Sequence, residues 1–295
     1  MTTSEPLVVK VGGAAAVDPA GALADVAALR DDRDVVVVHG GSTAMDETLE
    51  RLGIEPEYVE TPDGVVGRFT DAETMDVFTM VMPGLVNTDL VVGLQNHGVN
   101  AVGLSGVDGR LLHGPRKSAV RVVEDGKKKI RRGDHSGSIE SVNHELLTTL
   151  LDTGYTPVVS VPMLGDEGPD ADPRFTAVNS DADRSAAAVA GALGADLVLL
   201  TDTRGVYRDP DDETTVVDRV DTPAAFTELQ TVAQGFMRRK VMAAAEALRR
   251  GAPTVVVASA NADAPIQAAL SGAGTTVTAD ALETDDATAD DEEPS

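Results

Sequence analysis

The chain of 295 residues has no cysteine and no long apolar run, and both absences exclude classes of protein. Without cysteine there can be no disulfide, no thiolate nucleophile and no cysteine-ligated metal site. No apolar stretch approaches the ~18 residues that a transmembrane helix needs. The N-terminus also lacks the basic segment followed by an apolar segment that marks a secretory signal. We therefore expect a soluble cytoplasmic protein that does not enter a membrane.

Positive charge is scarce, because 24 lysines and arginines accompany 49 acids and leave a formal net charge of −25. Only six of these bases are lysines. An acidic, lysine-poor surface is typical of a protein that stays solvated in concentrated salt, so we interpret the source as halophilic. The alternative is an acidic protein that merely avoids nucleic acid. In either case we expect no DNA or RNA partner, since phosphate backbones attract positive charge.

The scarce bases are unevenly distributed, and eight of the 24 lie within residues 116–132, RKSAVRVVEDGKKKIRR. Asp125-Gly126 is a turn signal, so the flanking segments 119–124 and 128–132 predict a β-hairpin. One explanation is that the lysines protect a sheet edge against aggregation. Docking of an acidic partner explains better why four of the six lysines gather here. The candidate docking residues are Arg116, Lys117, Lys127, Lys128, Lys129, Arg131 and Arg132.

Short apolar runs alternate with helical patterns along the chain, and this order predicts α/β architecture with a parallel sheet. We expect strands at 7–11, 35–38, 100–104, 157–161, 197–201 and 254–258. A hairpin is expected over 58–69, turning at Asp63-Gly64. We expect helices at 19–29, 43–52, 71–82, 85–96, 140–152, 183–193 and 237–250.

A loop rich in Gly, Pro and Asp over 166–173 marks an internal boundary. We therefore divide the chain into a first half, residues 1–170, and a second half, residues 171–279. The remaining residues, 280–295, contain eight acids, no base and little apolar content. Such a segment cannot bury enough apolar surface to fold, so we predict a disordered acidic tail.

Two glycine turns follow the first two predicted strands. Lys10-Val11-Gly12-Gly13 ends the first strand, where glycine lets backbone N–H groups approach an anion and lysine adds a charge. His39-Gly40-Gly41-Ser42-Thr43 joins the second strand to a helix, and a glycine turn at a helix N-terminus favours anion binding. A plain turn capped by Ser42 or Thr43 is the alternative. Neither turn matches the P-loop or GxGxxG, which disfavours a Rossmann dehydrogenase.

Two later segments open predicted helices. Asn179-Ser180-Asp181-Ala182-Asp183 places acids at a helix N-terminus, where they stabilise the helix dipole or else hold lysine ammonium groups and a substrate. Residues 235–241, GFMRRKV, place bases in a first helical turn. Bases there oppose the dipole, which indicates a nearby anion unless the turn is simply a solvated surface.

In this order, from Val8 to about Val277, the four motifs resemble the amino acid kinase family. That family pairs Lys-x-Gly-Gly with His-Gly-Gly, Asn-x-x-x-Asp and Gly-x-Met-x-x-Lys. Here one residue is inserted at Gly235-Phe236-Met237 relative to the usual acetylglutamate kinase pattern. The nearest resemblance is to the [LysW]-aminoadipate and [LysW]-glutamate kinases, relatives of acetylglutamate kinase that act on an amino acid tethered to a small acidic carrier protein. Residues 39–42, 100–137 and 233–241 carry this finer resemblance.

The resemblance implies a three-layer sandwich around a mainly parallel sheet, with substrate bound by the first half and ATP by the second. It implies transfer of the γ-phosphoryl group of MgATP to a side-chain carboxylate, which gives an acyl phosphate. The implied catalytic residues are Lys10, Asp183 and Lys240. The implied substrate-binding residues are Gly40, Gly41, Ser42, Arg68 and Asn179. The implied ATP-binding residues are Gly12, Gly13, Thr201, Asp202 and Tyr207.

The resemblance also implies an acidic amino-group carrier protein of the LysW type as partner, and a homodimer. Arg68 would hold the substrate α-carboxylate, with an ion pair to Asp71 as the alternative. His39 is expected to be structural, and no metal is expected beyond the Mg²⁺ that accompanies ATP. Only nine residues precede Lys10, so we do not expect the N-terminal helix that mediates arginine inhibition in some acetylglutamate kinases.

Two other functions stay open at this point. A kinase for free N-acetylglutamate could share every active-site residue named above. A non-catalytic amino-acid-sensing domain of the same fold is the other candidate, and the retention of Lys10 and Lys240 argues against it. Whether the substrate is glutamate or aminoadipate is not decided by the sequence.

Overall fold

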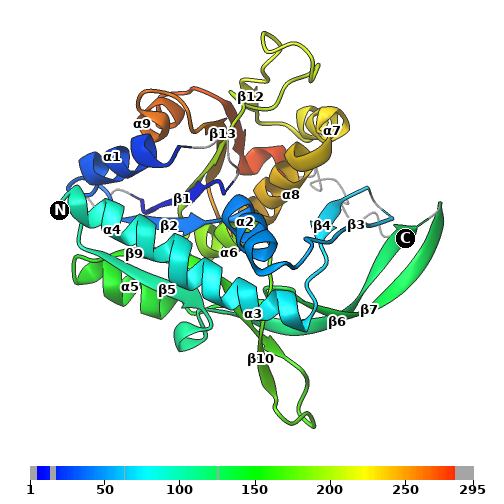
Figure 1. Ribbon diagram of the computed structural model, residues 1–295. Coiled ribbons are helices and arrows are strands. Elements are labelled where there is room, and N and C mark those ends of the chain that lie inside the picture. Colours follow the sequence, from blue (N-terminus) through cyan, green and yellow to red (C-terminus); the bar gives the residue numbers. More distant parts are fainter. Residues whose placement is uncertain (1–4, 14–17, 63, 125, 283–295) are drawn as a thin grey trace, which may run out of the picture.

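The computed structural model describes residues 5–13, 18–62, 64–124 and 126–282. Its main sheet contains the strands β1 (Leu7–Val11), β2 (Val35–His39), β5 (Ala101–Gly106), β6 (Leu112–Glu124), β7 (Lys127–Gly137), β8 (Ser141–Val142), β9 (Thr156–Asp166), β10 (Phe175–Val178), β11 (Asp196–Thr201), β12 (Arg219–Val220), β13 (Thr254–Ser259) and β14 (Thr275–Thr278). Their order is β12-β14-β13-β11-β1-β2-β9-β6-β7, while β5 and β10 pair with β9 and β8 pairs with β6 (Figure 1). The central pairs from β13 to β9 are parallel.

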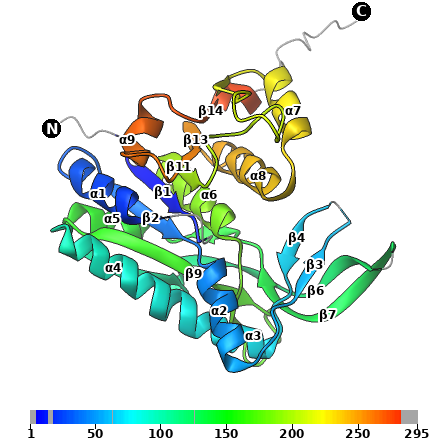
Figure 2. The same cartoon turned by 45° about the horizontal axis from the view of Figure 1, so that its top comes forward.

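Helices cover both faces of this sheet, as Figures 1 and 2 show. One layer contains α5 (His144–Asp152), α6 (Ala182–Leu193), α7 (Pro223–Val232) and α8 (Gly235–Arg249). The other contains α1 (Ala20–Leu29), α4 (Asn87–Asn96) and α9 (Pro265–Leu270). A smaller apolar cluster joins α2 (Ser42–Leu52) and α3 (Ala72–Met80) to the end of the sheet. The predicted three-layer α/β fold with a mainly parallel sheet is confirmed.

Central strands are buried on both faces, and their side chains alternate between the two helical layers. Val8, Val36 and Val38 pack toward α6 and α8. Val9 and Val37 pack toward α1 and α4. Because both faces are covered, these strands appear in the sequence as continuous apolar runs rather than as an apolar–polar alternation.

One long helix replaces the two helices that were predicted at 71–82 and 85–96. A π-helical turn, Val81–Val86, joins α3 to α4 and contains Pro83 and Gly84. Pro83 and Gly84 suggested a break between two helices. A π turn accommodates them inside one continuous helix, because its N–H groups bond to the carbonyl five residues earlier instead of four. The joined helix, Ala72–Asn96, is long enough to cross a membrane, and an 18-residue window within it has a mean hydropathy of 1.6. Here one side of it packs against α1, β5 and β9, while the other side is exposed, so it is a helix of the layer that covers the sheet.

Several other elements differ from the predicted ones. The helix expected at 140–152 begins at His144, because residues 141–142 form β8 and the Asn143 side chain caps the helix by accepting from Leu146 N–H. Four short strands, β8, β10, β12 and β14, were not predicted, and neither were α7 and α9. These elements span two to ten residues and show weak periodicity, so tertiary contacts rather than local pattern decide them.

Two hairpins project side by side from the same end of the molecule (Figures 1 and 2). The first consists of β3 (Tyr58–Glu60) and β4 (Val66–Arg68), as predicted. The second, β6–β7, is longer than the predicted segments. The turn residues Asp63 and Asp125 lie outside the described residues, as do residues 283–295 of the predicted tail. The boundary between residues 170 and 171 stays a prediction, since one sheet continues through both halves.

Candidate active site

The predicted motifs meet where neighbouring strands and helices end. Lys10 lies on β1, beside Val38 of β2 and Leu199 of β11. The carboxyl ends of adjacent parallel strands share one edge of the sheet, which is where α/β folds commonly bind ligands. The helices α2 and α6 both begin at this edge, so their N-terminal N–H groups add positive potential there.

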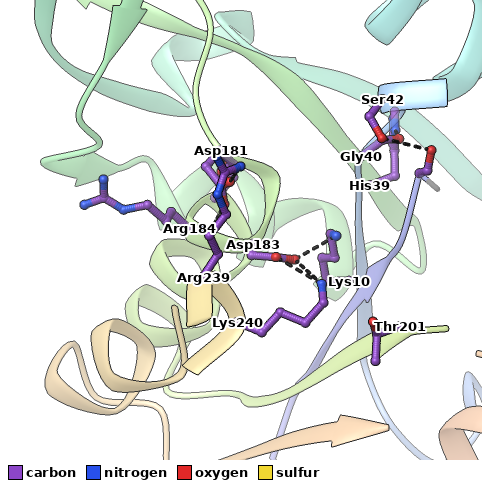
Figure 3. A network of polar contacts seen from close by, with 12 residues as sticks. Lys10, His39, Gly40, Ser42, Asp181, Asp183, Arg184, Thr201, Arg239 and Lys240 are labelled. Carbon is purple, nitrogen blue, oxygen red and sulfur yellow. Dashed lines mark hydrogen bonds and ion pairs between the residues drawn. The ribbon is translucent and has the colours of Figure 1, made fainter. Parts of the chain in front are cut away.

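Two lysines from distant parts of the chain converge on one carboxylate, as Figure 3 shows. Lys10 Nζ lies 2.7 Å from Asp183 Oδ1. Lys240 Nζ, on the second turn of α8, lies 3.1 Å from Asp183 Oδ2. The three residues are only 6 to 8% exposed. The structure therefore brings all three predicted catalytic residues together, and their catalytic roles stay predictions.

The group carries one net positive charge in a buried setting. Burial alone would raise the pKa of the Asp183 carboxyl, but the charges of Lys10 and Lys240 outweigh it and hold that pKa well below its ordinary value. Burial and the charge of Lys10 lower the pKa of Lys240, an effect that Asp183 opposes. Two buried ammonium groups sharing one counter-ion are suited to receive a further anion such as a phosphoryl group.

The two glycine turns pack directly against each other beside these lysines. A Cβ atom on Gly13 would come within 2.1 Å of the backbone N of Gly41, so only glycine allows this approach. Thr43 N–H donates to the Gly13 carbonyl over 3.1 Å, and Ser42 Oγ donates to the same oxygen over 3.3 Å. The start of α6 is also close, because a Cβ on Gly40 would lie 3.7 Å from Ala182 Cβ. Backbone N–H groups from two turns thus gather at one place.

Arg68 does not pair with Asp71, which instead caps α3 by accepting from Thr74 N–H. The partner of Arg68 is Asp46 on α2, and Arg68 Nη1 lies 2.7 Å from Asp46 Oδ1. Tyr58 completes the group: its hydroxyl accepts from Arg68 Nη2 and donates to Asp46 Oδ2, each over 2.8 Å. The guanidinium is thereby fixed at the base of the β3–β4 hairpin.

Asn179 is fixed by a second polar group, which consists of Thr70, Asp134 and Ser136. Its Nδ2 donates to Thr70 Oγ1 over 2.9 Å, and Thr70 N–H donates to the buried carboxylate of Asp134. Ser136 Oγ donates to the other oxygen of that carboxylate. The group links the start of α3, the end of β7 and the segment before α6.

The predicted nucleotide-side residues lie at the end of β11. Thr201 ends this strand, and its hydroxyl donates to Asp202 Oδ1 over 3.0 Å. Tyr207 pairs with Val216 across an isolated bridge, and its hydroxyl accepts from Arg204 N–H. Gly12 and Gly13 follow β1, the strand that pairs with β11. Their ATP-binding roles stay predictions.

Three of the seven predicted docking residues form ion pairs with acids of this chain. Arg116 and Arg131 are used internally: Arg116 pairs with Glu167, while Arg131 pairs with Glu57 and lies over the Phe69 ring at 4.1 Å. Lys129 pairs with Glu124 on the neighbouring strand. The remaining predicted docking side chains are exposed, and they are Lys117, Lys127, Lys128 and Arg132.

Some residues of the site were missed by the sequence argument. Asp46, Tyr58 and Thr70 hold predicted residues, yet no motif contains them. Arg239 pairs with Asp181 and also reaches the β3–β4 hairpin, where a Cβ on Gly67 would lie 3.1 Å from its Nη2. The two consecutive arginines before Lys240 were the available signal, because bases there oppose the helix dipole.

Comparison with known proteins identifies the family of this chain. Residues 5–259 match the model of the amino acid kinase family. The chain belongs to the amino acid kinase family. It is 44% identical over 278 residues to a [LysW]-aminoadipate kinase of Thermus thermophilus, covering 92% of this chain and 99% of that protein. It is 40% identical over 273 residues to an acetylglutamate kinase of Methanopyrus kandleri, covering 92% and 99%.

Solved structures share the fold. N-acetylglutamate synthase from Neisseria gonorrhoeae superposes with a TM-score of 0.72 at 24% identity, over 94% of this chain and 60% of the synthase. Carbamate kinase from Giardia lamblia bound to AMP-PNP superposes with a TM-score of 0.65 at 15% identity, over 94% and 99%. Membership of this kinase family, predicted from four short motifs, is confirmed.

Proposed function

We propose that this chain transfers the γ-phosphoryl group of MgATP to the side-chain carboxylate of glutamate or 2-aminoadipate linked to an acidic amino-group carrier protein. The observation that carries the phosphoryl transfer is the buried contact of Lys10 and Lys240 with Asp183. The names of relatives that are 41 to 44% identical over most of the chain support the carrier-linked substrate. The products are an acyl phosphate and ADP.

Catalysis in this proposal consists of positioning and charge stabilisation. A carboxylate oxygen of the substrate attacks the γ-phosphorus in line while the bond to the β-phosphate oxygen breaks. The ammonium groups of Lys10 and Lys240 stabilise the negative charge on the transferring group, and Asp183 keeps both aimed at it. N–H groups near Gly13 and Gly41 contribute further hydrogen bonds. Arg68 binds the α-carboxylate with guanidinium N–H groups other than those that face Asp46 and Tyr58, and Asn179 holds the substrate.

The residues present fit a magnesium ion that arrives with ATP. Within residues 5–13, 18–62, 64–124 and 126–282, no three His, Asp or Glu side chains gather as ligands for a metal. Asp183 is occupied by two ammonium groups. Mg²⁺ commonly keeps several waters and binds through substrate phosphates, so phosphate and water oxygens would supply its ligands.

The β6–β7 hairpin offers the acidic carrier an exposed basic face. Directly paired residues of an antiparallel ladder lie on the same face, and the pairs are Arg121–Ile130, Val123–Lys128 and Ala119–Arg132. On this face Ile130 is 68% exposed, and Arg121, Lys128 and Arg132 surround it. The opposite face carries Arg131, which the protein uses internally. An apolar centre with a basic rim fits an acidic protein surface.

We also propose a homodimer, because the resemblance to the family implies one. An apolar hollow of about 280 Å³, bordered by Leu52, Met80 and Leu85, is one exposed surface that a second copy could cover. Sedimentation equilibrium in high salt would give the mass of the assembly. A monomer at micromolar concentration would contradict the dimer.

The central test is trapping of the acyl phosphate with hydroxylamine in high salt. Glutamate and aminoadipate carried on the acidic protein are compared with free N-acetylglutamate. We expect hydroxamate from at least one carrier-linked substrate and little from the free compound. The variant Lys10→Ala is the blank, and its turnover should fall on the order of 10²-fold because a charge-stabilising donor is lost.

Each other outcome selects an alternative. Robust activity on free N-acetylglutamate alone would make the chain an acetylglutamate kinase, the function of the Methanopyrus relative. Binding of an amino acid without hydroxamate from any substrate would favour the sensing domain. Equal turnover of the wild type and Lys10→Ala would refute the assignment of the site.

A further inference from the structure

The π turn between α3 and α4 stands directly behind the Gly40–Gly41 turn. The backbone N–H of Asn87 donates to the Met82 carbonyl, five residues earlier, so both residues lie on the same side of the helix. Met82 and Val86 pack against the glycine turn. A Cβ on Gly41 would lie 2.8 Å from Met82 Sδ and 3.2 Å from Val86 Cγ2. The extra residue of the π turn therefore directs Asn87 at the end of β2.

Asn87 is buried, with 4% of its surface exposed, and its amide group has a fixed orientation. Its Nδ2 lies 2.9 Å from the Val158 carbonyl oxygen and 3.0 Å from His39 Nε2. A carbonyl oxygen only accepts hydrogen bonds, so the amide nitrogen must face it. The amide oxygen fills the space over Gly103, where a Cβ would come within 2.1 Å of it.

This arrangement determines which nitrogen of His39 carries the proton. The Asn87 amide nitrogen donates only, so His39 Nε2 must accept, and the single proton of a neutral imidazole resides on Nδ1. His39 Nδ1 then donates to the Gly40 carbonyl oxygen, 3.0 Å away. Burial lowers the pKa of His39 to about 4, and the nearby Lys10 charge acts in the same direction, so the ring is neutral at pH 7.

We propose that Asn87 and His39 are positioning residues that orient the Gly40–Gly41 peptide toward the transferring phosphoryl group. In a trans peptide the C=O and N–H bonds point in opposite directions. Fixing the Gly40 carbonyl on His39 therefore aims the Gly41 N–H away from the core. Within the described part of the chain, this N–H has no hydrogen-bond acceptor. The inference rests on the proposed phosphoryl transfer for its effect on turnover.

The first experiment measures the tautomer without any substrate. Imidazole ¹⁵N shifts are recorded on the full chain from pH 5.5 to 8, and the His39→Gln variant assigns the signal. We expect a neutral ring with the proton on Nδ1 throughout. A proton on Nε2, or an imidazolium near pH 6, would overturn the inference whether or not the proposed function holds.

The second experiment measures kcat and KM of Asn87→Asp and Asn96→Asp across the same pH range. At position 87 a carboxylate cannot donate to His39 Nε2. Either the single proton of the neutral ring moves from Nδ1 to Nε2, or the ring takes a second proton from solvent and becomes imidazolium. We expect kcat at pH 8 to fall at least 10-fold, with KM for ATP within about twofold. Toward pH 6 kcat should partly recover, because the new carboxylate raises the pKa of His39 and imidazolium donates from Nδ1 again.

Two controls separate positioning from folding. Asn96 is exposed at the end of α4, so Asn96→Asp makes the same chemical change and should leave kcat and its pH profile unchanged. His39→Gln retains a donor for the Gly40 carbonyl and should keep more activity than His39→Leu by at least fivefold. Equal losses in those two variants, or a uniform loss in Asn87→Asp with no recovery at pH 6, would refute the positioning role.

Discussion

At the scale of single residues, the site depends on one carboxylate between two ammonium groups. Asp183 is the counter-ion of both Lys10 and Lys240, and all three are buried. Lys10 and Lys240 hold the pKa of the Asp183 carboxyl below its ordinary value, so this carboxyl is ionised at any pH above the lowered pKa. The ionised Asp183 stabilises the fold fully when the pH is above the pKa that this carboxyl has in the unfolded chain. This stabilisation is lost as the pH falls through the lower pKa that it has in the folded chain. The arrangement therefore persists at neutral and alkaline pH until a lysine loses its proton.

The variant Asp183→Asn tests whether the Asp183 carboxylate keeps Lys240 protonated. Without the carboxylate, burial and the charge of Lys10 are no longer opposed, so the pKa of Lys240 falls further. A neutral Lys240 cannot stabilise the phosphoryl charge. We expect the alkaline limb of kcat against pH to move down by at least about one pH unit. An exposed exchange, Asp89→Asn on α4, should leave that limb in place, and an unmoved limb in Asp183→Asn would contradict the assignment.

At the scale of elements, helix ends and strand faces explain most of the arrangement around the site. The helix α9 has six residues, and its start is held by Asp25 of α1 rather than by a local cap. One carboxylate oxygen of Asp25 accepts from Ile266 N–H and Gln267 N–H, and the other accepts from Gln267 Nε2. A buried carboxylate thus ties two elements of the same layer together.

Replacing Asp25 with alanine should lower the free energy of unfolding by about 2–3 kcal/mol, because buried donors lose a charged acceptor. Urea unfolding of the full chain measures the effect. Asp76→Ala, an exposed change on α3, should alter stability by less than about 0.5 kcal/mol. Similar stabilities for the two variants would show that water replaces the lost acceptor at α9.

The β6–β7 hairpin yields a second prediction at this scale. Replacing Arg121, Lys128 and Arg132, the bases of the exposed face, with Gln should raise KM for the carrier-linked substrate and leave KM for ATP unchanged. At ~1 M salt the Debye length is ~3 Å, so the effect must come from short contacts rather than steering. A matched control removes the same charge elsewhere, at Arg51, Arg219 and Arg249. Equal effects of both triple variants, or none, would make the hairpin a simple solvated edge.

At the scale of the whole molecule, charge is the dominant property. A net charge of −25 repels itself at low ionic strength and destabilises the compact state. The basic hairpin is a local exception, with eight bases against two acids in residues 116–132. Salt should therefore stabilise the folded chain while it weakens long-range attraction to any acidic partner.

The melting temperature should rise as KCl increases from 0.1 to 2 M, because the Debye length shortens from ~10 Å to less than ~3 Å and screens the repulsion between acids. Differential scanning calorimetry at fixed pH measures it. A melting temperature that stays flat or falls across this range would contradict the interpretation of the chain as a protein adapted to concentrated salt.

Much of the fold and the site was accessible from the sequence because the signals are local. Buried parallel strands appear as apolar runs, as at Val35–His39. Glycine turns mark the places where backbones meet, as at Gly13 and Gly41. The elements that the sequence did not indicate, such as α7, β12 and β14, are short and are stabilised by contacts with distant residues.

The sequence by itself determined the α/β alternation, because residue types and spacing record it directly. Its motifs also carried the resemblance to the family, and that resemblance singled out the two lysines and the aspartate. Only the tertiary structure decided which partners these residues have. Arg68 pairs with Asp46 rather than Asp71, and Asn87 meets His39 through a π turn. Such contacts join residues 22 to 48 positions apart, and their geometry depends on how whole elements pack, which no local pattern specifies.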